Sequence, residues 1–125
     1  MADHRDEIME SLAHQISLVY TMLVDVCRML PVPIELPADK HTPGRQAVPA
    51  IQRVVELGRD QPMGDLQEGQ LYSGCIHLLA AIDLYALCSM RYHETRAEAC
   101  GANLLCAEDP LKTLMVWLLI HNSTE

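Results

Sequence analysis

Nineteen consecutive residues, from Tyr72 to Met90, carry only one charged side chain, Asp83. No proline interrupts this stretch, and its pattern is typical of a helix. A helix with so few charges needs cover from neighbouring elements on almost every side. The carboxylate inside it must be paired, hydrated, protonated or used in chemistry, because an unpaired buried charge is costly. The stretch therefore predicts a helix packed at the centre of a helical domain.

The length and composition predict one domain that associates with itself. A chain of 125 residues supports one hydrophobic core and is too short for two, so we expect a single helical domain over residues 1–125. Half of the residues are apolar and 21% are charged, which leaves more apolar surface than a small monomer hides easily. We therefore expect a twofold homodimer, with the third or the last helix at the contact.

Charge and cysteine usage predict the partners and the compartment. The net charge of −8 argues against a nucleic-acid partner and against docking on an anionic membrane. The acidic N-terminus is unlike a signal peptide, residues 72–90 barely reach spanning length, and residues 111–120 are too short to span. Five cysteines, an odd number set mostly in apolar pattern, indicate free thiols in a reducing compartment. Arginine exceeds lysine and phenylalanine is absent, which is typical of a GC-rich bacterial genome, so we expect a bacterial cytoplasmic protein.

Hydrophobic periodicity predicts the first two helices. The first runs from Asp6 to Leu30, with an apolar residue every three or four positions along one seam. Prolines and polar residues make residues 31–48 a connecting loop, which in a small domain packs across the bundle or covers a site. A short second helix then begins at Pro49 and ends at Gly58.

The third predicted helix is the one that contains residues 72–90 with their single charged side chain. Asp65 and Glu68 form a variant of the capping box that starts this helix, which continues to about Tyr92. A glycine inside a helix weakens it by about 1 kcal/mol relative to alanine. Gly74 therefore indicates that another helix approaches closely at this point.

Beyond Tyr92 the pattern has two interpretations. A second capping box at Thr95 favours a break and a new helix, whereas the scarcity of glycine and proline allows one continuous helix over residues 66–107. Pro110 suits the first turn of a last helix, whose run over residues 114–120 we expect to be almost fully buried. The predicted fold class is all-α, an irregular bundle of four or five helices, two of them long.

The sequence contains none of the common motifs for metals, nucleotides or covalent catalysis. Glu-x-x-His pairs, Cys-x-x-Cys and His-Glu-x-x-His, which place metal ligands on one face, do not occur. Glycine-rich phosphate loops and the Gly-x-Ser-x-Gly elbow are also absent. We therefore expect neither a metal nor a cofactor.

Two groups of polar residues are candidates for a ligand-binding or acid–base site. Asp25 and Arg28 belong to a polar stripe of the first helix, which is either its solvated side or the wall of a polar cavity. At this spacing they can also pair with each other. In the third helix, Asp83 has four alternative roles. It pairs with an arginine of another helix, it binds a ligand, it acts in acid–base chemistry, or it is exposed to solvent. His77 is either a hydrogen-bonded core histidine or an acid–base group, and Tyr85 is a further ligand-binding candidate.

Three functions are compatible with these features. The first is a binding protein that holds an apolar or amphipathic small molecule between helices, oriented by the isolated polar groups. The second is a cofactor-independent enzyme, such as an isomerase, cyclase or lyase, with Asp83 or His77 as the acid–base group. The third is a protein–protein interaction module that docks a partner helix on an exposed seam.

Overall fold

The computed structural model describes residues 4–38 and 44–123, and in this part of the chain it contains helices and no strand. This confirms the all-α class. The elements are α1 (His4–Met29), α2 (Gly44–Gly58), α3 (Asp65–Met90) and α4 (Glu94–Ser123). At 30 residues, α4 is longer than either of the 26-residue helices α1 and α3.

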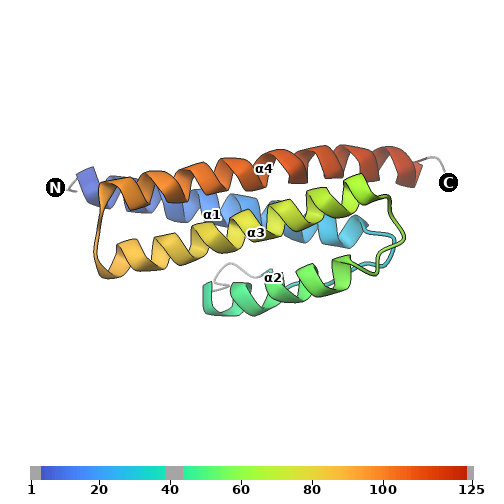
Figure 1. Cartoon of the computed structure of the whole chain (residues 1–125), viewed down its shortest axis with the longest axis horizontal. Coiled ribbons are helices and arrows are strands. Elements are labelled where there is room, and N and C mark those ends of the chain that lie inside the picture. The colour runs from blue at the N-terminus through green and yellow to red at the C-terminus, as the bar shows by residue number, and fades with distance from the viewer. Residues whose placement is uncertain (1–3, 39–43, 124–125) are drawn as a thin grey trace.

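Three long helices form the body of the bundle. α1, α3 and α4 lie side by side, and α3 runs antiparallel to the other two (Figure 1). The shorter α2 packs against the first half of α3 only, and the second half of α3 extends beyond it (Figure 1). The largest fully buried side chains come from every helix: Leu23, Ile51, Leu78, Leu104, Leu111, Leu114 and Leu118.

The last part of the chain is one helix, which corrects the prediction that Pro110 starts a new one. A proline inside a helix removes a hydrogen bond and weakens the helix by about 3 kcal/mol. The reason α4 continues is an unbroken heptad seam of buried residues on both sides of the proline. This seam consists of Ala97, Cys100, Leu104, Ala107, Leu111, Leu114 and Leu118. The break between α3 and α4, in contrast, is confirmed.

Two predicted helix starts are also corrected. α2 begins at Gly44 and contains Pro49, because buried Ala47 extends its apolar face by one turn. The predicted loop over residues 31–48 is therefore shorter, and its residues 39–43 lie outside the described residues. At the start of α3 the cap is Gly64, which has no side chain to accept a hydrogen bond, so the expected Asp65 capping box does not form.

Gly74 marks the close approach that the sequence predicts. A Cβ atom added at this position would lie 2.6 Å from both Cγ and Cδ2 of Leu111 on α4. These contacts are too short for any real Cβ atom, so only glycine allows α3 and α4 to approach this closely. The prediction is confirmed.

The surfaces of α3 and α4 are more apolar than expected. In α4 the side chains of Val116, Leu119 and Ile120 are exposed, so the prediction that residues 114–120 are almost fully buried is wrong. The bundle covers a single face of this helix end, where Leu114 and Leu118 pack.

One side of α3 also faces away from the bundle, and we call it the α3 face. It contains exposed residues one or two turns apart, namely Gly69, Tyr72, Ile76, Asp83, Leu87 and Met90, with half-buried Ala80 between them. Asp83 lies on this face, about 180° around the helix from buried Gly74. Residues 72–90 are therefore covered on one side only within a single chain.

By length and composition, α3 is apolar enough to cross a membrane, and it is the only such helix among the described residues. Of its most apolar 18-residue window, 39% is buried inside the bundle. A core helix of a soluble protein meets the same criterion, so this feature is weak evidence for a membrane span.

All five cysteines are free thiols, and four of them are buried. Burial raises the pKa of Cys27 to about 12 and that of Cys100 to about 11, from an ordinary value of 9.0, and it raises the pKa of Cys75 still further. Above pH ~9 these thiols lose their protons in the unfolded chain and keep them in the folded protein. The folded state then binds more protons, so its stability falls as the pH rises.

We therefore expect the free energy of unfolding to fall between about pH 9 and about pH 11, by up to about 1.4 kcal/mol per pH unit for each thiol whose pKa is raised by burial. Urea denaturation across this range measures the slope. In the Cys27→Ala variant this slope should be smaller by the contribution of one thiol, because the variant has no Cys27 proton to lose. An unchanged slope in that variant would show that the Cys27 thiol ionises equally well in the folded and unfolded states.

Candidate functional site

The polar stripe of α1 is its solvated side. Asp25 and Arg28 are both exposed. Arg28 pairs with Glu35 of the segment after α1, at 3.7 Å between Nε and Oε2. Both side chains are more than half exposed, so this pair contributes little to stability.

The candidates on α3 point in different directions. Half-buried His77 has its Nδ1 3.1 Å from Oδ1 of Asn103 on α4, as expected for a hydrogen-bonded histidine between helices. Asp83 is exposed on the α3 face, and no ion pair joins it to an arginine among the described residues. Tyr85 lines a cleft of about 340 Å³ near the start of α1, together with Arg5 and Tyr92. The structure therefore does not bring His77, Asp83 and Tyr85 into one site.

A different site lies around the segment that follows α1, residues 31–38, which we call the strap. Pro31, Pro33 and Pro37 keep it extended, because proline fixes the backbone and lacks an N–H group for helix formation. Its Ile34 and Leu36 side chains are buried in the core. The strap thus packs across the bundle, as the sequence predicts for this connection.

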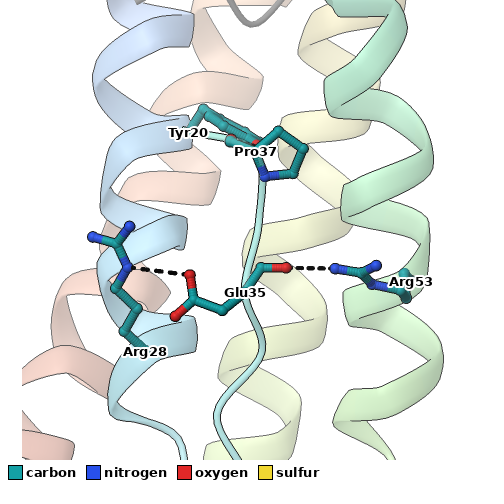
Figure 2. Close-up of polar contacts among 5 residues, drawn as sticks. All are labelled: Tyr20, Arg28, Glu35, Pro37 and Arg53. Carbon is teal, nitrogen blue, oxygen red and sulfur yellow. Dashed lines mark hydrogen bonds and ion pairs between the residues drawn. The ribbon is translucent and has the colours of Figure 1, made fainter. Parts of the chain in front are cut away.

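Side chains from α1 and α2 hold the strap in place between the two helices (Figure 2). The Tyr20 hydroxyl on α1 donates a hydrogen bond to the Pro37 carbonyl at 2.6 Å, and burial raises the pKa of this tyrosine. Glu35 lies between two arginines. Its carboxylate pairs with Arg28 of α1, and its carbonyl accepts a hydrogen bond from Arg53 of α2 (Figure 2).

Gln61, in the turn between α2 and α3, fixes the start of the strap. Its Nε2 donates to the Val32 carbonyl at 2.7 Å, and its Oε1 accepts from the Val32 N–H at 2.9 Å. It is 5% exposed and is the one buried polar side chain among the described residues. Its amide thus satisfies both backbone groups of one strap residue, as a neighbouring β-strand would.

A groove of about 610 Å³ runs between the strap and the end of α2. Its apolar lining comes from Val32, Pro33 and Ile34 of the strap and from Leu57 of α2. Four polar residues complete it: Glu35, Arg53, Asp60 and Gln61. Val32 and Leu57 are 58% and 42% exposed, so apolar surface inside the groove is open to a ligand.

The sequence does not reveal the groove, because its residues come from two separate segments that only the fold brings together. Arg53 has the pattern of a solvated residue on the polar side of α2, and Gln61 is an ordinary turn residue with no recognisable motif. The prolines of the strap are the one signal in the sequence, and they indicate a packed connection without showing which helix lies across from it.

The described residues contain no group of three or more His, Cys, Asp or Glu side chains that could hold a metal ion. Comparison of the chain with models of known protein families, with curated proteins and with solved structures finds no match. The function must therefore be inferred from the groove and from the exposed surfaces.

Proposed function

We propose that this protein is a small binding protein for an amphipathic small molecule, and that the groove between the strap and α2 is its ligand site. The observation that carries this proposal is the combination of exposed apolar lining with a few polar groups in one groove of about 610 Å³. Small-molecule sites in proteins commonly have this size and this composition.

The polar groups favour a ligand with a charged or hydrogen-bonding end. Arg53 uses one N–H group on the Glu35 carbonyl and has further donors in its guanidinium. Asp60 supplies an acceptor in the same groove. An apolar body on Val32 and Leu57, with a polar end near Arg53, fits this arrangement.

Binding has more support than catalysis. The two acid–base candidates, Asp83 and His77, do not face a common cavity, and His77 already has Asn103 as its partner. An enzyme of the isomerase, cyclase or lyase type needs such groups within reach of the same substrate atoms. The proposed ligand site therefore lies beside the strap and not at the centre of the bundle.

The anionic fluorophore 8-anilinonaphthalene-1-sulfonate tests the groove, because it combines an apolar body with a sulfonate that suits Arg53. We expect its affinity to fall about tenfold or more in the Leu57→Glu variant, which places a carboxylate among the apolar lining. The matched control is Leu66→Glu, at an exposed leucine of α3 that lies outside the groove. Equal binding by wild type and Leu57→Glu would remove the groove as the ligand site.

We further propose that the protein acts as a homodimer in the bacterial cytoplasm, with neither nucleic acid nor membrane as a partner. The support is the exposed apolar surface on α3 and at the end of α4, together with the acidic net charge of −8. Sedimentation equilibrium at micromolar concentration should give a mass of twice 14.0 kDa. A monomer at all concentrations would contradict this proposal and leave the groove proposal intact.

A further inference from the structure

We infer that two copies of this chain dock antiparallel through the α3 face, around a twofold axis that crosses the helix at the level of residue 81. The Met90 end of each α3 then meets a recess at the start of the other copy's α3. This inference rests on the proposed self-association and names the surface that carries it. Three features of the described residues support a second copy as the occupant of this face.

The first feature is that the spacing of the α3 face is symmetric. Tyr72 and Met90 each lie nine residues from position 81, which is about 14 Å along the helix. Ile76 and Leu87 lie five and six residues from it. In an antiparallel pair Tyr72 therefore meets Met90 of the other copy, and Ile76 meets Leu87. A twofold contact requires such self-complementarity, which an unrelated partner would not need.

The second feature is a knob and a recess on the same helix. Met90 is 84% exposed, which makes it the most exposed of the large apolar side chains among the described residues. A recess of about 340 Å³ lies between α2 and the first turns of α3, with Val54, Val55 and Leu71 among its lining residues. It adjoins the α3 face, because Gly69 and Tyr72 line it too. Antiparallel docking brings the flexible Met90 side chain to this recess.

The third feature is charge complementarity at the same place. The recess also contains Asp65 and Glu68, with Arg59 as its one basic residue. Arg91 follows Met90 directly and is exposed. In the antiparallel arrangement Arg91 comes within one helical turn of Glu68 of the other copy, and the contact occurs twice. The opposed helix dipoles favour the same arrangement, since each α3 C-terminus lies beside an N-terminus.

The α3 face is large enough for a stable dimer. From Gly69 to Met90 it spans about 32 Å. A strip of that length and about 25 Å width, with the edge of α4 along it and the edge of α2 beside its first half, covers roughly 800 Å² on each copy, as standard interfaces do. Half-buried Ala80 lies next to the axis, where a small side chain lets two helices approach closely.

Asp83 gives this arrangement a distinctive consequence. Asp83 lies two residues from position 81, so the two copies of Asp83 are separated by only about 6 Å along the length of the helices. Two carboxylates this close repel each other. The Asp83→Asn variant should therefore dimerise more tightly than wild type, with a dimer Kd lower by about threefold or more.

Sedimentation equilibrium of the full chain tests the docking surface. Ile76→Lys should weaken the dimer at least about tenfold, and Arg91→Glu and Glu68→Arg should each weaken it. The double variant Arg91→Glu/Glu68→Arg should restore the dimer Kd to within about threefold of wild type, because it re-forms each charge pair with the signs exchanged. Leu105→Lys, on exposed surface of α4, should leave the Kd unchanged. Circular dichroism confirms that each variant is folded.

The alternative outcomes separate this inference from the proposal beneath it. A monomeric wild type overturns both. A wild-type dimer that tolerates Ile76→Lys and dissociates with Leu105→Lys keeps self-association and overturns the α3 surface. Failure of the charge exchange to rescue the single variants overturns the antiparallel arrangement. Binding of a monomer to vesicles of phosphatidylcholine and phosphatidylglycerol, lost in Ile76→Lys, would make the α3 face a membrane contact instead.

Discussion

Replacing Gln61 with leucine should lower the free energy of unfolding by about 2 kcal/mol or more. The amide of Gln61 makes two hydrogen bonds to Val32 and is buried. Each such bond contributes about 1 kcal/mol, and a backbone group left without a partner costs more. Leucine fills a similar volume and makes neither bond. Urea denaturation measures the loss as a lower midpoint at a constant m-value.

Two further variants show whether the hydrogen bonds cause this effect. Gln61→Glu keeps an acceptor for the Val32 N–H and loses the donor to the Val32 carbonyl. Its destabilisation relative to wild type should shrink at about pH 4, where the protonated carboxyl donates again. Gln52→Leu, at an exposed position of α2, should change stability by less than about 0.5 kcal/mol. Equal losses at Gln52 and Gln61 would contradict the assigned role.

Gly74→Ala should destabilise the protein although alanine is the better helix former. The added Cβ lies 2.6 Å from two side-chain atoms of Leu111, which is fully buried, so relieving the contact must displace packed side chains. Overpacking of this kind costs about 1–3 kcal/mol, against a gain of about 1 kcal/mol in helix propensity. The difference is a net loss of up to about 2 kcal/mol in the free energy of unfolding, measured by urea denaturation.

The matched control is Gly101→Ala, on the helix that faces Gly74. Its new Cβ would make an ordinary contact, 3.7 Å from Leu12, so the propensity gain should remain and the protein should become more stable. A double-mutant cycle with Leu111→Ala identifies the contact. The added Cβ should cost at least about 1 kcal/mol less when Leu111 is truncated. Additive effects would mean that the clash is relieved elsewhere.

The helical class, the α3–α4 break and the role of Gly74 could be predicted because each depends on local pattern. Periodicity determines which residues pack inward, and a glycine inside an otherwise strong helix commonly has a packing role. Pro110 shows the limit of local rules. A proline at such a position usually indicates a helix start. In α4 the helix continues because the heptad seam is buried on both sides of Pro110.

The candidate site was less predictable, because burial of a polar residue depends on tertiary structure. Asp83 is isolated among apolar residues in sequence and nevertheless faces outward, since α2 and α4 flank α3 without enclosing it. Gln61 directly follows two charged residues, Arg59 and Asp60, and is nevertheless buried against the strap. Neither outcome can be read from the residue's own neighbours along the chain.

The pairing of α1 with α4 has a consequence for the order in which the protein folds. The Asn122 side chain donates a hydrogen bond to the Met29 carbonyl at 3.3 Å, across 93 positions in the chain. Closing so long a loop costs more chain entropy than closing the short turn between α3 and α4. We therefore expect the α3–α4 hairpin to form early and α1 to dock late. The N-terminal helix would then be the last to gain protection from amide hydrogen exchange during refolding.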